Sequence, residues 1–209
     1  MSGLPVVGDV ATEPSSPPDT QLHRGWMILL LAAALVIAVA AVVLVRWSSL
    51  PDGVPVGPNG TQQVAVSSRN HVPLDPPVDY SPEPPAGGDH FEVWQNCGTY
   101  DEPLIDEFVV HSMEHGAVWV TYRPDLPANQ IEQIRDIVRD GYVGDERYIV
   151  LSPYEGLSDD VVASAWGRQL RLDGVDDPRL LEFLQLFAGG PQSPEKLYPC
   201  SGGEGTPLD

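Results

Sequence analysis

The chain has 209 residues and a formal net charge of −19, because 30 acidic side chains outnumber 11 basic ones. Its length allows one modest domain with appendages. Nucleic-acid binding is excluded, since phosphate contacts require clustered lysines and arginines, and electrostatic recruitment to an anionic lipid surface is disfavoured for the same reason. The 22 prolines and 20 glycines make up about a fifth of the chain, well above average usage, and indicate long extended segments.

The N-terminal region predicts a tail followed by a membrane anchor. Residues 1–25 are proline-rich and poor in apolar side chains, which predicts a disordered tail. From Trp26 to Val45, twenty consecutive residues carry no charge, amide or proline. A helix of that length spans about 30 Å, the thickness of a bilayer core. We therefore predict a transmembrane helix over residues 26–46 rather than a cleaved signal peptide, whose apolar core is shorter.

The orientation of this anchor rests on indirect signals. One arginine flanks each end, Arg24 and Arg46, so the positive-inside rule gives almost no bias. Residues 47–209 carry 27 acidic and 9 basic side chains, a net charge of −18, and they contain both cysteines. We predict a single-pass protein of the cell membrane, with the tail in the cytoplasm and the large C-terminal part outside it.

Cys97 and Cys200 are the two cysteines of the chain. Neither belongs to a Cys-x-x-Cys motif, which argues against a thiolate metal site or dithiol redox chemistry. In an exported domain such a pair indicates a disulfide. It would close a loop of about 100 residues and stabilise the fold by about 4–5 kcal/mol. The alternative is a pair of free buried thiols in a cytosolic domain.

Beyond the anchor, the composition divides the chain into a stalk, a domain and a tail. Residues 47–63 are rich in proline and glycine and predict a stalk. The domain extends over residues 64–200, beginning with a short strand at Val64–Val66. Residues 73–85 hold too many prolines for a helix or a central strand, so we expect them to follow the domain surface as extended chain. Residues 201–209 predict a disordered C-terminal tail.

The folded core begins near residue 108. The β-branched and aromatic run Ala117–Tyr122 predicts a strand, and a helix with isoleucines on one face follows over residues 127–141. Tyr148–Leu151 predicts a second strand, and alternating apolar positions favour strand over helix within residues 161–172. A last helix begins at Pro178 after the capping residue Asp177. This order predicts an α+β fold, with a small antiparallel or mixed sheet and helices packed on one face.

Four of the five histidines fall within a 45-residue window of the predicted domain. Neutral imidazole suits zinc, copper, iron and nickel, and two of these histidines, His111 and His115, are four residues apart. We predict a mononuclear metal site built on His111 and His115. The other predicted ligands are His90, His71 and, as auxiliary donors, Met113 and Glu114. A soft thioether beside imidazoles in an oxidising compartment favours copper first and zinc second.

Two other interpretations of this cluster remain open. The histidines could be hydrogen-bonded structural residues without a metal. Alternatively, His111–His115 matches the H-x-x-E-H string of inverted zinc metalloproteases, in which the glutamate is a general base. That motif needs a continuous helix, and Gly116 and a predicted strand follow it directly. The sequence therefore identifies no catalytic residues and favours a non-enzymatic role.

Several runs of the chain resemble one bacterial family. They are Trp94–Tyr100, His111–Trp119, Ser152–Tyr154 and Ala163–Gly167. The family is known from actinobacterial and related membrane-anchored proteins as the domain of unknown function number 3105. The resemblance covers about residues 64–200 and implies an exported protein anchored by a single span, without implying an activity.

The sequence thus leads to two functional hypotheses of different classes. The first is a membrane-anchored extracytoplasmic domain that binds copper or zinc through its histidines. The second is a structural or interaction subunit of a cell-envelope complex, whose acidic surface and proline-rich segment contact a protein partner.

Overall fold

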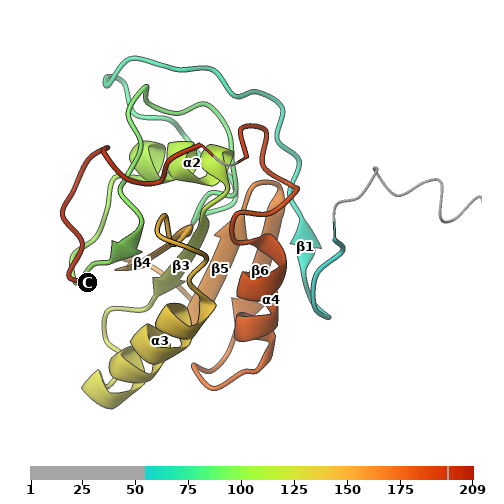
Figure 1. Ribbon diagram of the computed structural model, residues 1–209, viewed down its shortest axis with the longest axis vertical. Coiled ribbons are helices and arrows are strands. Elements are labelled where there is room, and N and C mark those ends of the chain that lie inside the picture. Colours follow the sequence, from blue (N-terminus) through green and yellow to red (C-terminus); the bar gives the residue numbers. More distant parts are fainter. Residues whose placement is uncertain (1–54, 197) are drawn as a thin grey trace, which may run out of the picture. The chain divides into compact units, whose positions relative to one another are not determined.

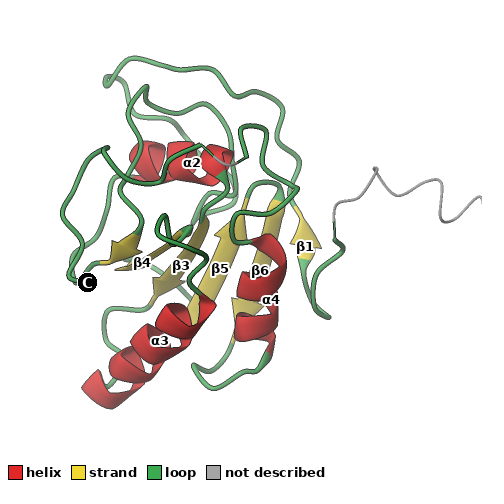
Figure 2. Cartoon of the chain, viewed as in Figure 1, coloured by secondary structure: helices red, strands yellow, loops and turns green. Residues whose placement is uncertain are grey.

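The computed structural model describes residues 55–196 and 198–209, and these form an α+β fold with a mixed sheet (Figures 1 and 2). The elements in chain order are β1 (Gln62–Gln63), β2 (Gly98–Thr99), α2 (Asp106–His115), β3 (Val118–Tyr122), α3 (Ala128–Gly141), β4 (Ile149–Pro153), β5 (Val161–Ala165), β6 (Arg168–Leu172) and α4 (Arg179–Phe187). The strand order is β1-β6-β5-β3-β4-β2. The predicted α+β class with a mixed sheet is confirmed.

Strand β3 lies at the centre of the sheet and pairs in both directions. It runs parallel to β4, with Val118 opposite Ile149, and antiparallel to β5, with Trp119 opposite Ser164. A parallel pair requires a crossover connection, which α3 provides. All five residues of β3 are buried. Burial on both faces explains why its sequence is a continuous apolar and aromatic run rather than an alternating one.

Helices α3 and α4 lie side by side against one face of the sheet (Figure 1). Their contact is close at Gly141, where an added Cβ would lie 2.9 Å from Leu184 Cδ1 and 3.1 Å from Ile149 Cδ1. Any larger side chain there would push the two helices and β4 apart. Together with Phe183 and Phe187, which are fully buried, these residues form the apolar core on this face.

The opposite face is covered by α2 and the proline-rich segment. Side chains alternate along a strand, so Trp119 points away from the face that Val118 and Ile149 share. Its indole packs edge-on against Tyr154 at 5.5 Å, and the Tyr154 hydroxyl donates to Asp106 of α2 at 2.9 Å. The prediction of helices on one face was wrong in this respect. The sequence analysis did not include α2, so it left this face without a helix.

The other predicted helices and strands agree with the structure to within a few residues at their ends. Two predictions differ: the segment 161–172 and the position of the first strand. The strands and helices expected at 117–122, 127–141 and 148–151 correspond to β3, α3 and β4, and the last helix to α4. The segment 161–172 is a hairpin of two strands, because Gly167 turns the chain at a φ of 70°. The first strand is Gln62–Gln63 instead of Val64–Val66.

The proline-rich residues 73–85 contain neither helix nor strand, and the end of this segment contacts β6. Gln169 Nε2 donates to the Pro84 carbonyl, and Arg171 Nη2 donates to the Glu83 carbonyl, each at 2.8 Å. Two side chains of the edge region therefore hold the segment by its backbone. This agrees with the expectation of an extended chain on the domain surface.

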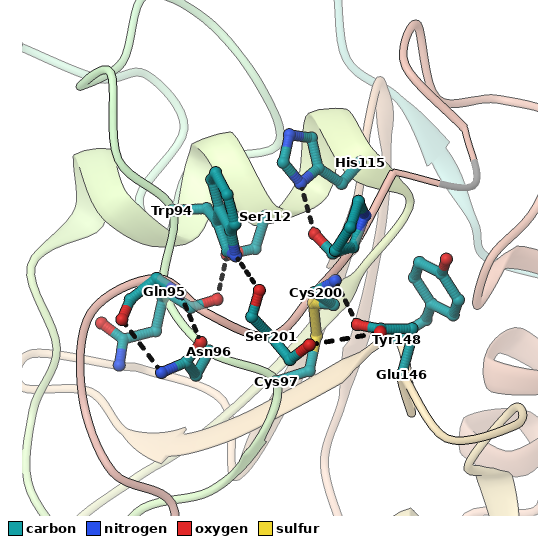
Figure 3. Close-up of a disulfide and its surroundings, with 12 residues drawn as sticks. Trp94, Gln95, Asn96, Cys97, Ser112, His115, Glu146, Tyr148, Cys200 and Ser201 are labelled. Carbon is teal, nitrogen blue, oxygen red and sulfur yellow. Dashed lines mark hydrogen bonds between the residues drawn. A yellow bond between two sulfur atoms is a disulfide. The ribbon is translucent and has the colours of Figure 1, made fainter.

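The C-terminal residues differ from the predicted disordered tail. The Leu208 amide donates to the Thr99 carbonyl at 2.8 Å, and the Asn96 amide donates to the Glu204 carbonyl at 2.8 Å. Their backbone thus satisfies polar groups along β2, at the edge of the sheet. Cys97 and Cys200 form a disulfide with their Cα atoms 5.4 Å apart, at the start of this pairing (Figure 3).

The predicted tail at 1–25, the predicted membrane helix at 26–46 and the beginning of the predicted stalk lie outside the described residues. Within residues 55–196 and 198–209, none of the helices combines the length and the apolar character that a membrane span needs.

Candidate metal centre

Helix α2 carries the centre of the histidine cluster. His111 and Glu114 are three residues apart and share a helix face, whereas Met113 lies on the face toward the apolar core. The helix ends at Gly116, whose φ of 116° is a left-handed conformation that favours glycine, and its amide donates to the Met113 carbonyl. The string 111–115 is therefore helical, although the sequence analysis predicted no helix there.

Four of the predicted ligands come together in one place. His71, His90, His111 and Glu114 each offer one ligand atom, and these atoms lie within 4.8 Å of one another. The three imidazole rings have centroids 4.7–5.0 Å apart. His90, His111 and Glu114 are buried, and His71 is exposed. Three separate segments of the chain therefore contribute to one small volume.

Backbone pairing brings the first two histidines side by side. His71 and His90 form an isolated parallel bridge, in which the Val72 amide donates to the His90 carbonyl at 2.8 Å and the His90 amide donates to the Asn70 carbonyl at 3.0 Å. The Asp89 carboxylate accepts a further bond from the Asn70 amide at 2.7 Å. The extended chain before the proline-rich segment is thereby fastened to the loop that carries His90.

The two buried imidazoles are oriented by carbonyl groups. His90 Nδ1 lies 2.9 Å from the Gly88 carbonyl oxygen, and His111 Nδ1 lies 2.8 Å from the Phe91 carbonyl oxygen. A carbonyl only accepts, so Nδ1 carries the hydrogen in both rings. In the neutral imidazole, Nε2 then holds the lone pair, and this is the arrangement found around metal-binding histidines.

Glu114 faces His90 across a short gap. Its Oε2 lies 3.0 Å from His90 Nε2, yet that nitrogen is buried and has no hydrogen-bond partner of suitable geometry among the described residues. The other carboxylate oxygen, Oε1, lies 3.3 Å from Arg69 Nη1. The sequence analysis missed Arg69, because a single arginine in an extended segment has no motif around it.

The protonation states favour metal binding. The pKa of His111 is lowered to about 4, mainly by burial; the hydrogen bond with the Phe91 carbonyl opposes this shift and the nearby histidines add to it. Burial alone would raise the pKa of Glu114, but His90, His111 and Arg69 together outweigh it and lower that pKa. At neutral pH, His111 is thus a neutral imidazole and Glu114 a carboxylate. These are the forms that coordinate a metal.

His115 and Met113 lie apart from this group. His115 Nδ1 contacts the Pro199 carbonyl oxygen at 2.7 Å, and its ring packs against Trp94 at 5.0 Å (Figure 3). Although the His115 ring is only 4.6 Å from that of His111, it does not join the four donors. Met113 is fully buried in the hydrophobic core. The argument for copper from a thioether ligand therefore loses its basis.

The disulfide holds the segment that orients His115. Cys97 and Cys200 tie the chain before α2 to the residue after Pro199. The Cys200 amide also donates to Glu146 Oε2 at 2.6 Å, and Trp94 Nε1 donates to the Ser201 carbonyl at 3.2 Å (Figure 3). This second cluster is a structural brace next to the histidine centre.

The donor set fits a first-row transition metal. Metal bonds of about 2.0–2.1 Å place tetrahedral ligand atoms about 3.4 Å apart, so four atoms within 4.8 Å need only a small closing movement. Three imidazole nitrogens and one carboxylate oxygen are borderline to hard donors. The fold and this centre define an α+β domain with a buried histidine–carboxylate cluster.

The comparison with protein families gives one match. The family model described as "Protein of unknown function (DUF3105)" matches residues 71–202, and the chain belongs to this family. The matched region begins at His71 and contains all four clustered donors. No curated protein and no solved structure matched the chain.

Proposed function

We propose that this domain binds a divalent first-row transition metal ion through His71, His90, His111 and Glu114. The observation that carries the proposal is the contact between His90 Nε2 and Glu114 Oε2. His90 Nδ1 is bonded to the Gly88 carbonyl, and Nε2 of the same ring lies only 3.0 Å from a carboxylate oxygen without making a hydrogen bond to it. A nitrogen lone pair and a carboxylate oxygen in a buried place repel each other unless a proton or a metal ion lies between them, and the geometry here does not suit a hydrogen bond.

Zinc is our first candidate for the ion. Three imidazoles and a carboxylate match its usual nitrogen and oxygen ligands, and it accepts a tetrahedral site without electronic preference. Divalent copper is the second candidate, because it binds such sites more strongly than other first-row ions. This reverses the order predicted from the sequence, which depended on Met113.

We propose binding rather than hydrolysis by the His111–His115 string. In the inverted metalloprotease pattern both histidines bind the metal and the glutamate acts as the base. Here Glu114 belongs to the donor group and His115 does not. Glu114 is thus placed as a ligand and not as a base, and His115 is not placed as a ligand.

We further propose that the domain acts outside the cytoplasm, anchored by residues 26–46. The uninterrupted apolar run from Trp26 to Val45 supports the anchor. The disulfide between Cys97 and Cys200 supports an oxidising compartment. Both native cysteines are buried, so the test uses a cysteine introduced at the exposed Val56. In Val56→Cys, a membrane-impermeant thiol reagent should label the new cysteine in intact cells, and labelling only after lysis would contradict this orientation.

The metal proposal is tested by metal content. Full-length protein without a histidine tag is purified in detergent, incubated with zinc or copper, desalted and measured by elemental analysis. We expect one ion per chain in the wild type and less than about a tenth of that in His111→Gln. His115→Gln is the matched control, because His115 lies on the same helix and also contacts a carbonyl through Nδ1; it should retain the ion.

Two results would contradict the proposal. One is a wild-type protein that retains neither zinc nor copper. The other is equal metal content in His111→Gln and the wild type, with both proteins folded by circular dichroism.

A further inference from the structure

A cavity of about 230 Å³ lies beside the candidate metal centre. It is lined by Val66, Ser67, Ser68, Arg69 and Trp166. Two of these residues contact the donors: Arg69 reaches Glu114, and the Trp166 ring lies edge-on to the His90 ring with centroids 6.2 Å apart. The cavity therefore borders the side of the cluster that His90 and Glu114 form.

Arg69 has N–H groups that its contact with Glu114 does not use. A guanidinium group has five N–H donors in a planar fork. The contact with Glu114 involves Nη1, and the side chain is 56% exposed while the Glu114 side chain is 4% exposed. The guanidinium thus spans from a buried carboxylate to an open cavity, and its remaining donors are available to a ligand there.

The candidate metal centre becomes positively charged when the metal binds. The charges of Glu114 and Arg69 cancel, so a divalent ion leaves the loaded centre with a net charge of about +2. The rest of the protein is strongly acidic, with a net charge of −19 over the chain. The local electrostatic potential at this centre is then positive although the surrounding surface is negative, so an anion is attracted to the centre.

The walls of the cavity match a ligand with one anionic end. Ser67 and Ser68 bring hydroxyl groups that donate hydrogen bonds to oxygen atoms. Val66 and Trp166 provide an apolar surface on the other side. Arginine with a nearby metal ion is a recurrent combination for carboxylate and phosphate groups.

We infer that the metal-loaded protein binds a small oxyanion, a carboxylate or a phosphate group, in this cavity, at the guanidinium of Arg69 and next to the metal centre. This inference rests on the proposed metal binding. The guanidinium of Arg69 holds the anion, and the positive charge of the ion at the neighbouring Glu114 strengthens the attraction. The ion and Arg69 act together, so the metal-free protein binds the same anion much more weakly.

The test uses full-length protein loaded with Co²⁺, whose visible absorption responds to the arrangement of its ligands and therefore to a shift of Glu114 when Arg69 binds an anion. Acetate and inorganic phosphate are titrated separately at constant ionic strength, with chloride as the reference salt. We expect a saturable spectral change with one or both oxyanions and none with chloride. The two arms distinguish a carboxylate ligand from a phosphate ligand.

Four variants separate the contributions. Arg69→Gln should weaken anion binding at least about tenfold, and Arg69→Lys should weaken it less, because it keeps the charge but loses the fork. Ser67→Phe fills the cavity from an exposed position and should weaken anion binding with unchanged metal content. Arg168→Gln is the control, since Arg168 lies on the neighbouring β6 and its Nη1 donates to the Gly167 carbonyl.

The outcomes distinguish this inference from the metal proposal. If the wild type retains none of Co²⁺, Zn²⁺ and Cu²⁺, both are wrong. If the wild type binds the metal but shows no saturable response to acetate or phosphate, the oxyanion inference alone is overturned. It is also overturned if Arg69→Gln and Ser67→Phe, each with full metal content, bind the anions as tightly as the wild type.

Discussion

The two faces of the sheet are built by different means. On one face, α3 and α4 bury apolar side chains such as Phe183 and Leu184, and the packing is the kind that a periodic sequence produces. On the other face, α2 buries His111 and Glu114 with bonds to distant backbone carbonyls and charged partners. Burial of polar groups lowers stability unless each has a partner. The first face thus provides the apolar packing of the domain, and the second holds the polar cluster for which we propose metal binding.

The largest expected effect is on the apolar face. Phe183→Ala removes a fully buried ring of α4 and should lower the free energy of unfolding by about 3–5 kcal/mol. Denaturant unfolding measures this change. The protein that remains folded should keep its full metal content, and loss of the metal without loss of stability would contradict the division between the two faces.

The disulfide is expected to have the next largest effect. The two cysteines are 103 residues apart, a separation for which the chain-entropy model gives about 4–5 kcal/mol, whereas measured effects of disulfides are typically about 2–4 kcal/mol. Replacing Cys97 and Cys200 together by serine should therefore lower the free energy of unfolding by about 2–4 kcal/mol. Calorimetry of the oxidised wild type and the double variant measures the difference. Equal transition temperatures would show that the brace next to His115 adds no stability.

Metal binding should stabilise the polar face specifically. Zinc at about a hundredfold excess over its dissociation constant should raise the free energy of unfolding by about 2.7 kcal/mol. His111→Gln should lose this gain and His115→Gln should keep it, as measured by thermal unfolding with and without zinc. A gain that persists in His111→Gln would place the ion elsewhere.

The smallest expected effect is the pH dependence of the metal-free protein. The pKa of His111 is about 4 in the folded state and 6.5 in its ordinary state, so the unfolded chain binds more protons between these values. The contribution of His111 to stability is therefore complete above about pH 6.5 and is lost as the pH falls toward 4, at no more than about 1.4 kcal/mol for each pH unit. His111→Gln should flatten this slope in unfolding curves recorded across that range. An unchanged slope would mean that the imidazole is not shielded from water.

The elements of the apolar face could be predicted from the sequence because their signals are local. The isoleucines of α3 repeat at helical spacing, and the run of β3 is β-branched and aromatic. Helix α2 could not be predicted in this way. Its buried positions include Glu107, His111 and Ser112, which a periodicity analysis counts as exposed. Their burial depends on contacts with residues 17 to 29 positions away.

The residues of the candidate metal centre could be predicted only in part. The density of histidines indicated a metal site, and four of the six predicted donors come together in the fold. The sequence could not distinguish Glu114 from His115 as a donor, because both are within one helical turn of His111. The choice depends on which side of α2 faces His90 and which faces Pro199, and that is decided by long-range packing.

The exposure of His71 determines how an ion would enter and leave. His90, His111 and Glu114 are buried and fixed, whereas His71 reaches the centre on an extended chain held to His90 by two backbone hydrogen bonds. Breaking those two bonds removes one ligand and leaves the other three in place. Metal exchange would then be governed by the opening of this short bridge, at a rate independent of global unfolding.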